Sequence, residues 1–456
     1  MLRTVFVLAI ILVGTVYALQ GPFYGLLFYL WYAYFRPDYW MYDPGLIAPL
    51  NLSLVIGAGV LLTSLSAIGK FRPTRLVILV FLFLAQSVVS LMRSEHYASS
   101  LGSWTDFAKV MVITILITFL VSDRERFRSV LLVIGLSLGF EMAKQGWAQL
   151  VLNPGATNAN PSPMMGDNNG VAIGMMMLIP IFVALAQTAA RRWERYFHRF
   201  FIIGLFYRGI STYSRGGFLA ASAIGVIAFW RSKHKVRALL GIAVLAGIVW
   251  AVMPAQYWQR IDTIQSAGDE RDDSSEGRLF FWRIATIMAD SNPVTGVGFN
   301  GYEHSFSAYD TSGGAYGENR AVHSAWFGVL ADMGYPGLIL FVAVILVSFL
   351  TCRRVSRTVR GRPELSDLYT YTVALQSSFV AYVVGMTFLN GQYFEMFWHF
   401  VGLTVALDQI AAAAAATAPA EAVAEVSENP EPALDSFAPA SLRVIPLLSG
   451  GGGERA

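Results

Sequence analysis

The chain has few charged residues and almost no cysteine. Only 14% of its 456 residues are Asp, Glu, Lys or Arg, whereas a soluble protein carries roughly 25%. The single cysteine, Cys352, excludes an internal disulfide. The net charge of +3 is too small to indicate a nucleic-acid partner. No run of His, Cys and carboxylate residues has the pattern of a metal site, so neither a metal nor another cofactor is expected.

Long apolar runs replace the missing charge. Hydrophobic residues make up 55% of the chain, and their runs of about 17–25 residues are long enough to cross ~30 Å of hydrocarbon. The sequence therefore predicts an all-α, polytopic transmembrane helical bundle of about 12 spans. Beyond a first span within residues 3–35, spans are predicted at 46–68, 74–92, 104–121, 127–150, 168–188, 196–213, 214–230, 236–253, 336–351, 367–390 and 392–412.

Residues 3–35 form either one kinked span or two short ones split at Gly21-Pro22. We favour one span, because this parity leaves Arg3 and both chain termini in the cytoplasm.

Basic and uncharged connectors alternate between the spans. The basic connectors lie at 70–75, 123–128, 191–199, 231–237 and 352–362. Short basic loops are retained in the cytoplasm, so the other connectors are expected on the outer face.

Four regions follow from this topology. They are an N-terminal transmembrane bundle (1–253), an outer loop with a helix (254–335), C-terminal transmembrane helices (336–412) and a tail (413–456). The tail is rich in Ala, Pro and Glu, and this composition predicts a disordered cytoplasmic segment.

Candidate site residues gather on the outer face. Arg215 follows Ser214 and precedes two glycines, so its guanidinium is suited to a phosphate or diphosphate at the membrane surface. The competing interpretation is an arginine that extends to lipid headgroups. Arg278 and Trp282 are four residues apart, which places a cation and an aromatic ring on one helix face.

His323 starts an apolar helix that breaks at Gly334-Tyr335-Pro336-Gly337. A neutral imidazole there can accept a proton from a hydroxyl, although a histidine that only caps the helix is the simpler alternative. Asp332 lies about two and a half turns further on and is not expected to orient His323. Lys144 is either a ligand contact or an ion pair with Glu141 three residues away.

In combination, these segments resemble the O-antigen ligase/polymerase superfamily. The resemblance covers about residues 140–350. It rests on SRGG at an outer junction, GRxxxW and NPxxGxGF in the large loop, and HSxxxxxLADMGYPG at its end. The opening FYLWYAYFRPDYW and MGDNNGVA further resemble the exosortase-associated O-glycosylation ligases.

The resemblance implies a metal-independent, inverting glycosyltransferase in a bacterial inner membrane. A glycan on undecaprenyl diphosphate would be moved to a hydroxyl of an acceptor protein, lipid or glycan at the periplasmic face. His323 corresponds to the family's proposed base, Arg215 to its diphosphate-binding arginine and Arg278 to its charge-stabilising loop arginine. Lys144 is near the position of a family Lys-Gly pair, but Gln145 separates it from Gly146. The turn of Asp167, Asn168 and Asn169 also corresponds to a family turn.

Three functions remain open at this stage. An O-glycosylation ligase would transfer one block of glycan, and a polysaccharide polymerase would extend lipid-linked repeats. A flippase for lipid-linked glycans would move its substrate without proton chemistry. The ionisable groups lie mostly at the outer edge rather than at mid-membrane, which favours chemistry over transport.

Overall fold

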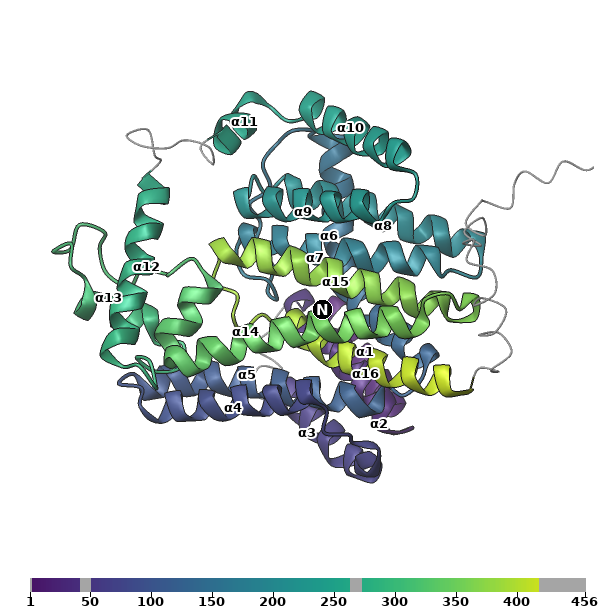
Figure 1. Cartoon of the computed structure of the whole chain (residues 1–456), viewed down its shortest axis with the longest axis horizontal. Helices are drawn as coiled ribbons and strands as arrows, with labels where there is room; N and C mark the ends of the chain where they lie inside the picture. Colours follow the sequence, from purple (N-terminus) through teal and green to yellow (C-terminus); the bar gives the residue numbers. More distant parts are fainter. Residues whose placement is uncertain (1, 42–50, 263–272, 418–456) are drawn as a thin grey trace, which may run out of the picture. The chain divides into compact units, whose positions relative to one another are not determined.

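The computed structural model describes residues 2–41, 51–262 and 273–417, without the side chains of 2, 260 and 273–276. This part of the chain is helical, and its only β-pairing is an isolated bridge between Ser162 and Gly166. In Figure 1 the long helices lie side by side, and α12 stands across their ends. The α-helices are α1 (Leu2–Ala18), α2 (Pro22–Phe35), α3 (Leu52–Ser64), α4 (Arg75–Met92), α5 (Tyr97–Leu120), α6 (Arg124–Leu152), α7 (Asn168–Gln187), α8 (Arg192–Ile210), α9 (Arg215–Arg231), α10 (Lys235–Val252), α11 (Ala255–Asp262), α12 (Asp273–Ser291), α13 (Tyr302–Tyr309), α14 (Ala325–Val359), α15 (Ser366–Gly385) and α16 (Glu395–Thr417).

The predicted all-α, polytopic membrane architecture is confirmed. Among the described residues, eight helical segments are long and apolar enough to cross a membrane. The helix α10 is apolar from Ala238 to its end and buries none of its residues against the rest of the chain. Such a surface would be costly in water and is stable in lipid. The predicted spans at 127–150, 196–213 and 214–230 coincide with the helices α6, α8 and α9, which lie outside the eight, so the total of twelve stays a prediction.

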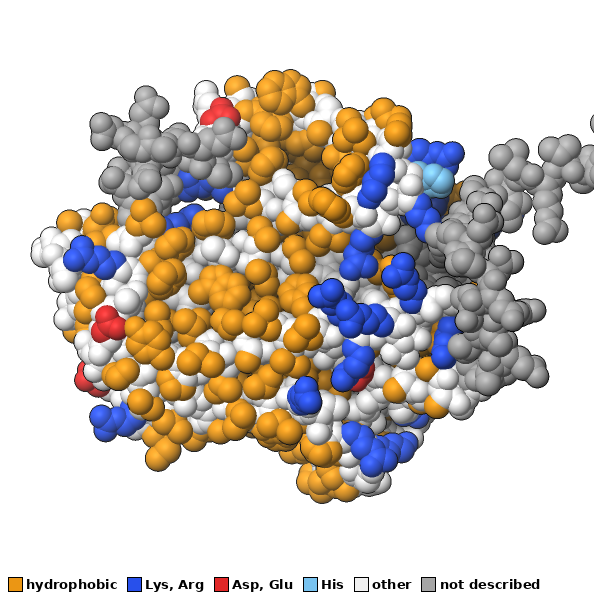
Figure 2. All heavy atoms as spheres, in the orientation of Figure 1, with side chains coloured by type: hydrophobic (Ala, Val, Ile, Leu, Met, Phe, Trp, Pro, Cys, Tyr) orange, Lys and Arg blue, Asp and Glu red, His pale blue; other side chains and the backbone are white. Residues whose placement is uncertain are grey.

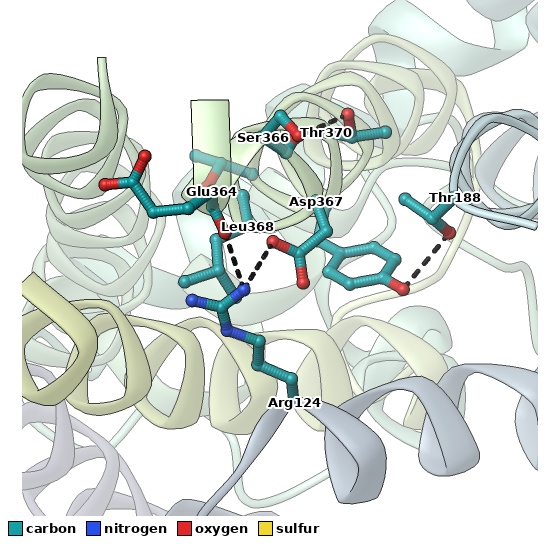
Figure 3. Close-up of polar contacts among 9 residues, drawn as sticks. Arg124, Thr188, Glu364, Ser366, Asp367, Leu368 and Thr370 are labelled. Carbon is teal, nitrogen blue, oxygen red and sulfur yellow. Dashed lines mark hydrogen bonds and ion pairs between the residues drawn. The ribbon is translucent and has the colours of Figure 1, made fainter. Parts of the chain in front are cut away.

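The basic connectors meet at one end of the bundle. Arg124 donates hydrogen bonds to the Glu364 carbonyl at 2.8 Å and to the Asp367 carboxylate at 3.2 Å (Figure 3). Arg128 pairs with Glu194 at 3.1 Å. These contacts join the connectors 123–128 and 191–199 to the chain just after the connector 352–362. Figure 2 shows Lys and Arg side chains gathered at one end of a largely hydrophobic face. We refer to this as the basic end.

The first 35 residues fold as a helical hairpin, so the favoured single kinked span is wrong. Gly21 has φ = 151°, which a side chain would strain, and Pro22 starts α2 where its missing N–H is not needed. α1 then runs back along α2, because the rings of Tyr17 and Tyr24 lie 4.8 Å apart and Ile11 packs in one cluster with Phe28.

The hairpin also fixes the direction of α1 relative to the basic end. The guanidinium of Arg126 lies 4.8 Å from the centre of the Phe23 ring, so α2 starts at the basic end. α1 is antiparallel to α2 and contacts the 3₁₀-helix η1 (Pro37–Trp40) that follows α2. The Leu2 end of α1 therefore points away from the basic connectors, and Figure 1 shows the N-terminus about half-way along the bundle. The side of the membrane on which the N-terminus lies stays a prediction. The predicted disordered tail, from residue 418 on, lies outside the described residues.

The predicted helix break at Gly334 is confirmed. Gly334 has φ = 67° and ψ = −169° inside α14, and a Cβ there would lie 2.5 Å from the Pro293 carbonyl oxygen. The Tyr335 N–H donates to that same oxygen at 2.9 Å. The kink thus admits the 292–296 segment of the outer loop against α14.

Asp332 ties the outer loop to the bundle. Its fully buried carboxylate accepts the Tyr302 N–H at 3.1 Å, the Tyr393 hydroxyl at 3.0 Å and the Gln392 amide at 3.3 Å. These partners come from the start of α13 and from the loop before α16. Asp332 therefore holds structure together and does not orient His323, as the sequence predicted.

Replacing Asp332 by alanine is expected to destabilise the protein by about 3 kcal/mol or more, because it leaves several buried donors without a partner. The apparent Tm of the purified protein in detergent checks this. Asp290→Ala is the matched control, because Asp290 is exposed and accepts one hydroxyl, from Tyr335 at 2.7 Å. An equal Tm for the two variants would contradict the assigned role.

Candidate functional site

Three helices start together at the end opposite the basic connectors. α7 ends beside Thr188, which binds Arg128 at the basic end, and α14 ends at Val359 within a basic connector. Their first residues must therefore lie at the other end. The start of α9 is beside that of α7, since a Cβ on Gly217 would lie 2.6 Å from the Ala172 Cβ.

The short 3₁₀-helix η6 (Met386–Phe388) joins the three helix starts. Trp326, in the first turn of α14, donates its indole N–H to the Thr387 hydroxyl at 3.0 Å. A Cβ on Gly216 of α9 would lie 3.4 Å from the Gly385 carbonyl oxygen, and a Cβ on Gly385 would lie 2.6 Å from the Ile173 side chain of α7. Each helix start carries partial positive charge and unpaired N–H groups, so their convergence favours an anion.

Two side-chain caps set the starts of α7 and α9. Asp167 accepts the Gly170 N–H at 2.9 Å and also the Asn169 side-chain amide at 3.0 Å. Ser214 caps α9 by accepting the Gly217 N–H at 3.2 Å. Asn168 joins the two turns, because its amide donates to the Thr212 carbonyl at 3.1 Å. The fold thereby brings Arg215 close to the turn of Asp167, Asn168 and Asn169, which is distant from Arg215 in the sequence.

His323 lies two residues before α14 in a strained conformation. Its φ of 50° falls in the left-handed region that non-glycine residues seldom adopt. Such strain costs of order 1–3 kcal/mol and is concentrated at functional positions. The neighbouring Ser324 is fully buried, and its hydroxyl finds no partner among the described residues.

The charges around His323 favour its neutral form. Burial lowers the pKa of His323, and the positive charge of Arg278 lowers it further, whereas Asp167 raises it and Arg320 again lowers it. Arg278 and Asp167, which the sequence selected from distant segments, therefore both act on this imidazole. An uncharged imidazole at neutral pH is available as a proton acceptor.

The helix α12 supports His323 from the outer loop. Trp282 donates its indole N–H to the Val322 carbonyl at 3.1 Å and stacks on Phe327 at 5.1 Å. The ring of Phe281 lies 6.4 Å from the His323 ring. Arg278 is one turn before Trp282, as predicted. Trp282 thus fixes the backbone beside His323, and a direct contact to a ligand stays a prediction.

Lys144 lies beside η1, apart from the three helix starts. Its ammonium pairs with Glu141 at 2.6 Å and lies 5.4 Å from the centre of the Trp40 ring. The ion pair that the spacing suggested is therefore present. A role of Lys144 in ligand binding stays a prediction.

Sequence reasoning missed two arginines. Arg320 is three residues before His323 and acts on its pKa, and this short spacing was a usable signal. Arg208 is fully buried, and it donates to the Gln145 side chain at 3.1 Å and to the carbonyls of Asn158 and Asn160 at 3.1 and 2.7 Å. It thereby positions the loop that leads to Asp167. Sequence reasoning also missed a cavity that is lined partly by Arg36 and Lys109.

Comparison with known proteins gives two matches. Residues 200–342 match the family model described as O-antigen ligase. Residues 2–203 match a family of unknown function, DUF5935. No curated protein matches the chain. The first match includes Arg215, Arg278, Trp282 and His323, and the second includes Lys144 and the Asp167 turn.

Proposed function

We propose that the chain is an O-antigen ligase-like membrane protein and, more specifically, an O-glycosylation ligase. The match of residues 200–342 to the O-antigen ligase family model supports this proposal. In this proposal the protein moves a glycan from undecaprenyl diphosphate to an acceptor hydroxyl at the periplasmic face of the bacterial inner membrane. The acceptor is a protein, a lipid or another glycan.

One observation carries this proposal. A half-buried histidine, held neutral by burial and by arginines, lies at the outer end of the bundle with three helix starts nearby. Glycosyl transfer from a diphosphate needs these two properties together. A base must take the proton of the attacking hydroxyl, and positive charge must stabilise the leaving diphosphate.

The proposed reaction is a single displacement. The acceptor oxygen attacks the anomeric carbon while the bond to the diphosphate oxygen breaks, so the configuration inverts. The hydroxyl proton passes to His323, and the electron pair of the broken bond stays on the diphosphate. Arg215, Arg278 and the helix starts stabilise that charge, and we therefore propose that the reaction is independent of metal. A chelator is expected to leave transfer intact.

Product analysis tests this function against its two alternatives. Proteoliposomes containing the wild-type protein receive lipid-diphosphate glycan and acceptor, and the products are separated on a gel. The ligase proposal predicts one transferred block per acceptor. A ladder of repeats would instead identify a polysaccharide polymerase. Translocation of the lipid-linked glycan without any transfer would identify a flippase.

The pH dependence of transfer is expected to report His323. The neutral imidazole is the active form, so kcat/KM rises with pH through the pKa of His323 and then levels. Arg320→Gln removes a charge that lowers this pKa, so the acidic limb moves to higher pH. Asp167→Asn removes a charge that raises it, so the limb moves to lower pH, and asparagine preserves the helix cap. Shifts in the same direction for both variants would contradict this assignment.

A further inference from the structure

A large open cavity lies toward the outer end of the bundle. It is lined by other residues than those around His323. Its volume of about 960 Å³ is at the upper end of the range of ligand pockets, roughly 300–1,000 Å³. Its wall comes from the second half of α2 and η1, the start of α3, the first half of α5, and the loop before α16. Most of this wall lies within residues 2–203, the region that matches a family of unknown function.

The charges of this cavity do not suit a diphosphate. Arg36 pairs with Asp38 at 2.9 Å, and Lys109 pairs with Asp106 at 2.7 Å. Glu395 adds a further carboxylate to the same wall. Three acids against two bases leave the lining neutral to negative. This lining offers an anion no net attraction, in contrast to the arginines around His323.

The uncharged part of the lining suits hydroxyl groups. Asn51, Asn300 and Gln392 supply amides that can both donate and accept hydrogen bonds. The Gln392 side chain is buried, and its Oε1 atom finds no partner among the described residues. Tyr39 and Tyr393 supply aromatic rings, on which the C–H faces of a sugar ring can stack. Amides and aromatic rings together are the chemistry that recognises a saccharide.

Backbone strain also concentrates in this cavity. Among the described residues, six non-glycine residues have positive φ, and Arg36, Asn51 and Asn300 of the cavity are three of them, at 50°, 40° and 52°. Asparagine adopts this region readily, so the strain falls mainly on Arg36, which ends α2.

Two segments of the chain line the cavity and continue to the site around His323. Pro163 and Met164 line the cavity, and the tight turn that contains them leads directly to Asp167, which acts on His323. The loop 390–395 lines the cavity as well, and it follows η6, where the three helix starts meet. A chain of sugar units in the cavity would therefore lie beside the reacting groups.

We propose that this cavity binds uncharged saccharide units of a glycan substrate, beside the site that binds the diphosphate. This inference rests on the proposed glycosyl transfer for the identity of the substrate. The sugar units belong either to the lipid-linked donor or to the acceptor, because both present the same hydroxyls and ring faces.

Photo-crosslinking in the native membrane tests this proposal. The photoreactive residue p-benzoylphenylalanine replaces Tyr39, which is 59% exposed and has the Arg36 guanidinium 4.7 Å from its ring centre. Tyr196 is the matched control, being 64% exposed with Arg199 at 5.7 Å from its ring. Tyr196 lies in a connector of the basic end. After irradiation, adducts are stained for carbohydrate, and transfer activity is measured in the same membranes without irradiation.

At least tenfold more carbohydrate adduct at Tyr39 than at Tyr196 is expected. The experiment is repeated with His323→Ala, so that it does not depend on turnover. Lipid phosphate in the adduct identifies the donor glycan, and its absence identifies the acceptor glycan. Intact transfer with no carbohydrate at Tyr39 would overturn the cavity proposal. A carbohydrate adduct at Tyr39, together with no transfer by the protein that has neither substitution, would support the cavity and overturn the proposed transfer instead.

Discussion

His323→Ala is expected to slow glycan transfer by about 10²–10⁴-fold, which is the usual contribution of a positioned base. The variant keeps the fold, because His323 lies outside the helices and because alanine removes no contact within the hydrophobic core. The rate is measured with purified protein and saturating donor. The loss should appear in kcat, because the base acts in the transition state rather than in binding.

His304→Ala is the matched control for this prediction. His304 is another histidine of the outer loop, exposed and bonded to Ser99 at 2.9 Å. Its loss is expected to leave the rate within a factor of about two, as is typical of exposed surface changes. Equal transfer rates for His323→Ala and the wild type would remove His323 from the mechanism.

Arg278→Ala is expected to lower kcat by about 10²–10³-fold, as is typical when one charge-stabilising donor is removed. The loss has a second cause, because Arg278 also keeps the pKa of His323 low. Removing it therefore shifts the acidic limb of the rate profile to higher pH. Arg278→Lys keeps the charge without the planar fork of donors, and its activity should be intermediate.

Arg283→Ala serves as the control on the same helix. Arg283 is exposed on α12, so its removal changes the net charge by the same amount without reaching His323. A similar loss of activity in both variants would show that α12 acts through its overall charge. Equal activity of Arg278→Ala and the wild type would contradict the proposed stabilisation of the diphosphate.

The sequence predicted the helical segments well, because these depend on local patterns. Apolar runs and alternating basic connectors follow directly from the membrane as a solvent. The helix break at Gly334 was predicted from the four consecutive residues Gly334-Tyr335-Pro336-Gly337. The sequence also selected Asp167, Arg278 and His323, although their mutual proximity requires the folded chain.

The features that were missed depend on contacts between distant segments. Gly21-Pro22 was readable as a break, but the packing of Ile11 with Phe28 decided that the chain folds back there. Asp332 binds groups that lie 30 and 60 positions away. The cavity combines η1 with the loop before α16, and neither segment has a motif that identifies a sugar site.

Release of the lipid carrier is the most direct test of the central claim. Purified protein in lipid nanodiscs receives undecaprenyl-diphosphate glycan and acceptor, and free undecaprenyl diphosphate is quantified beside glycosylated acceptor. The account predicts equal amounts of the two products with the wild type and almost none with His323→Ala. Glycan that crosses a bilayer while it stays on its carrier, at the same rate in both proteins, would contradict it.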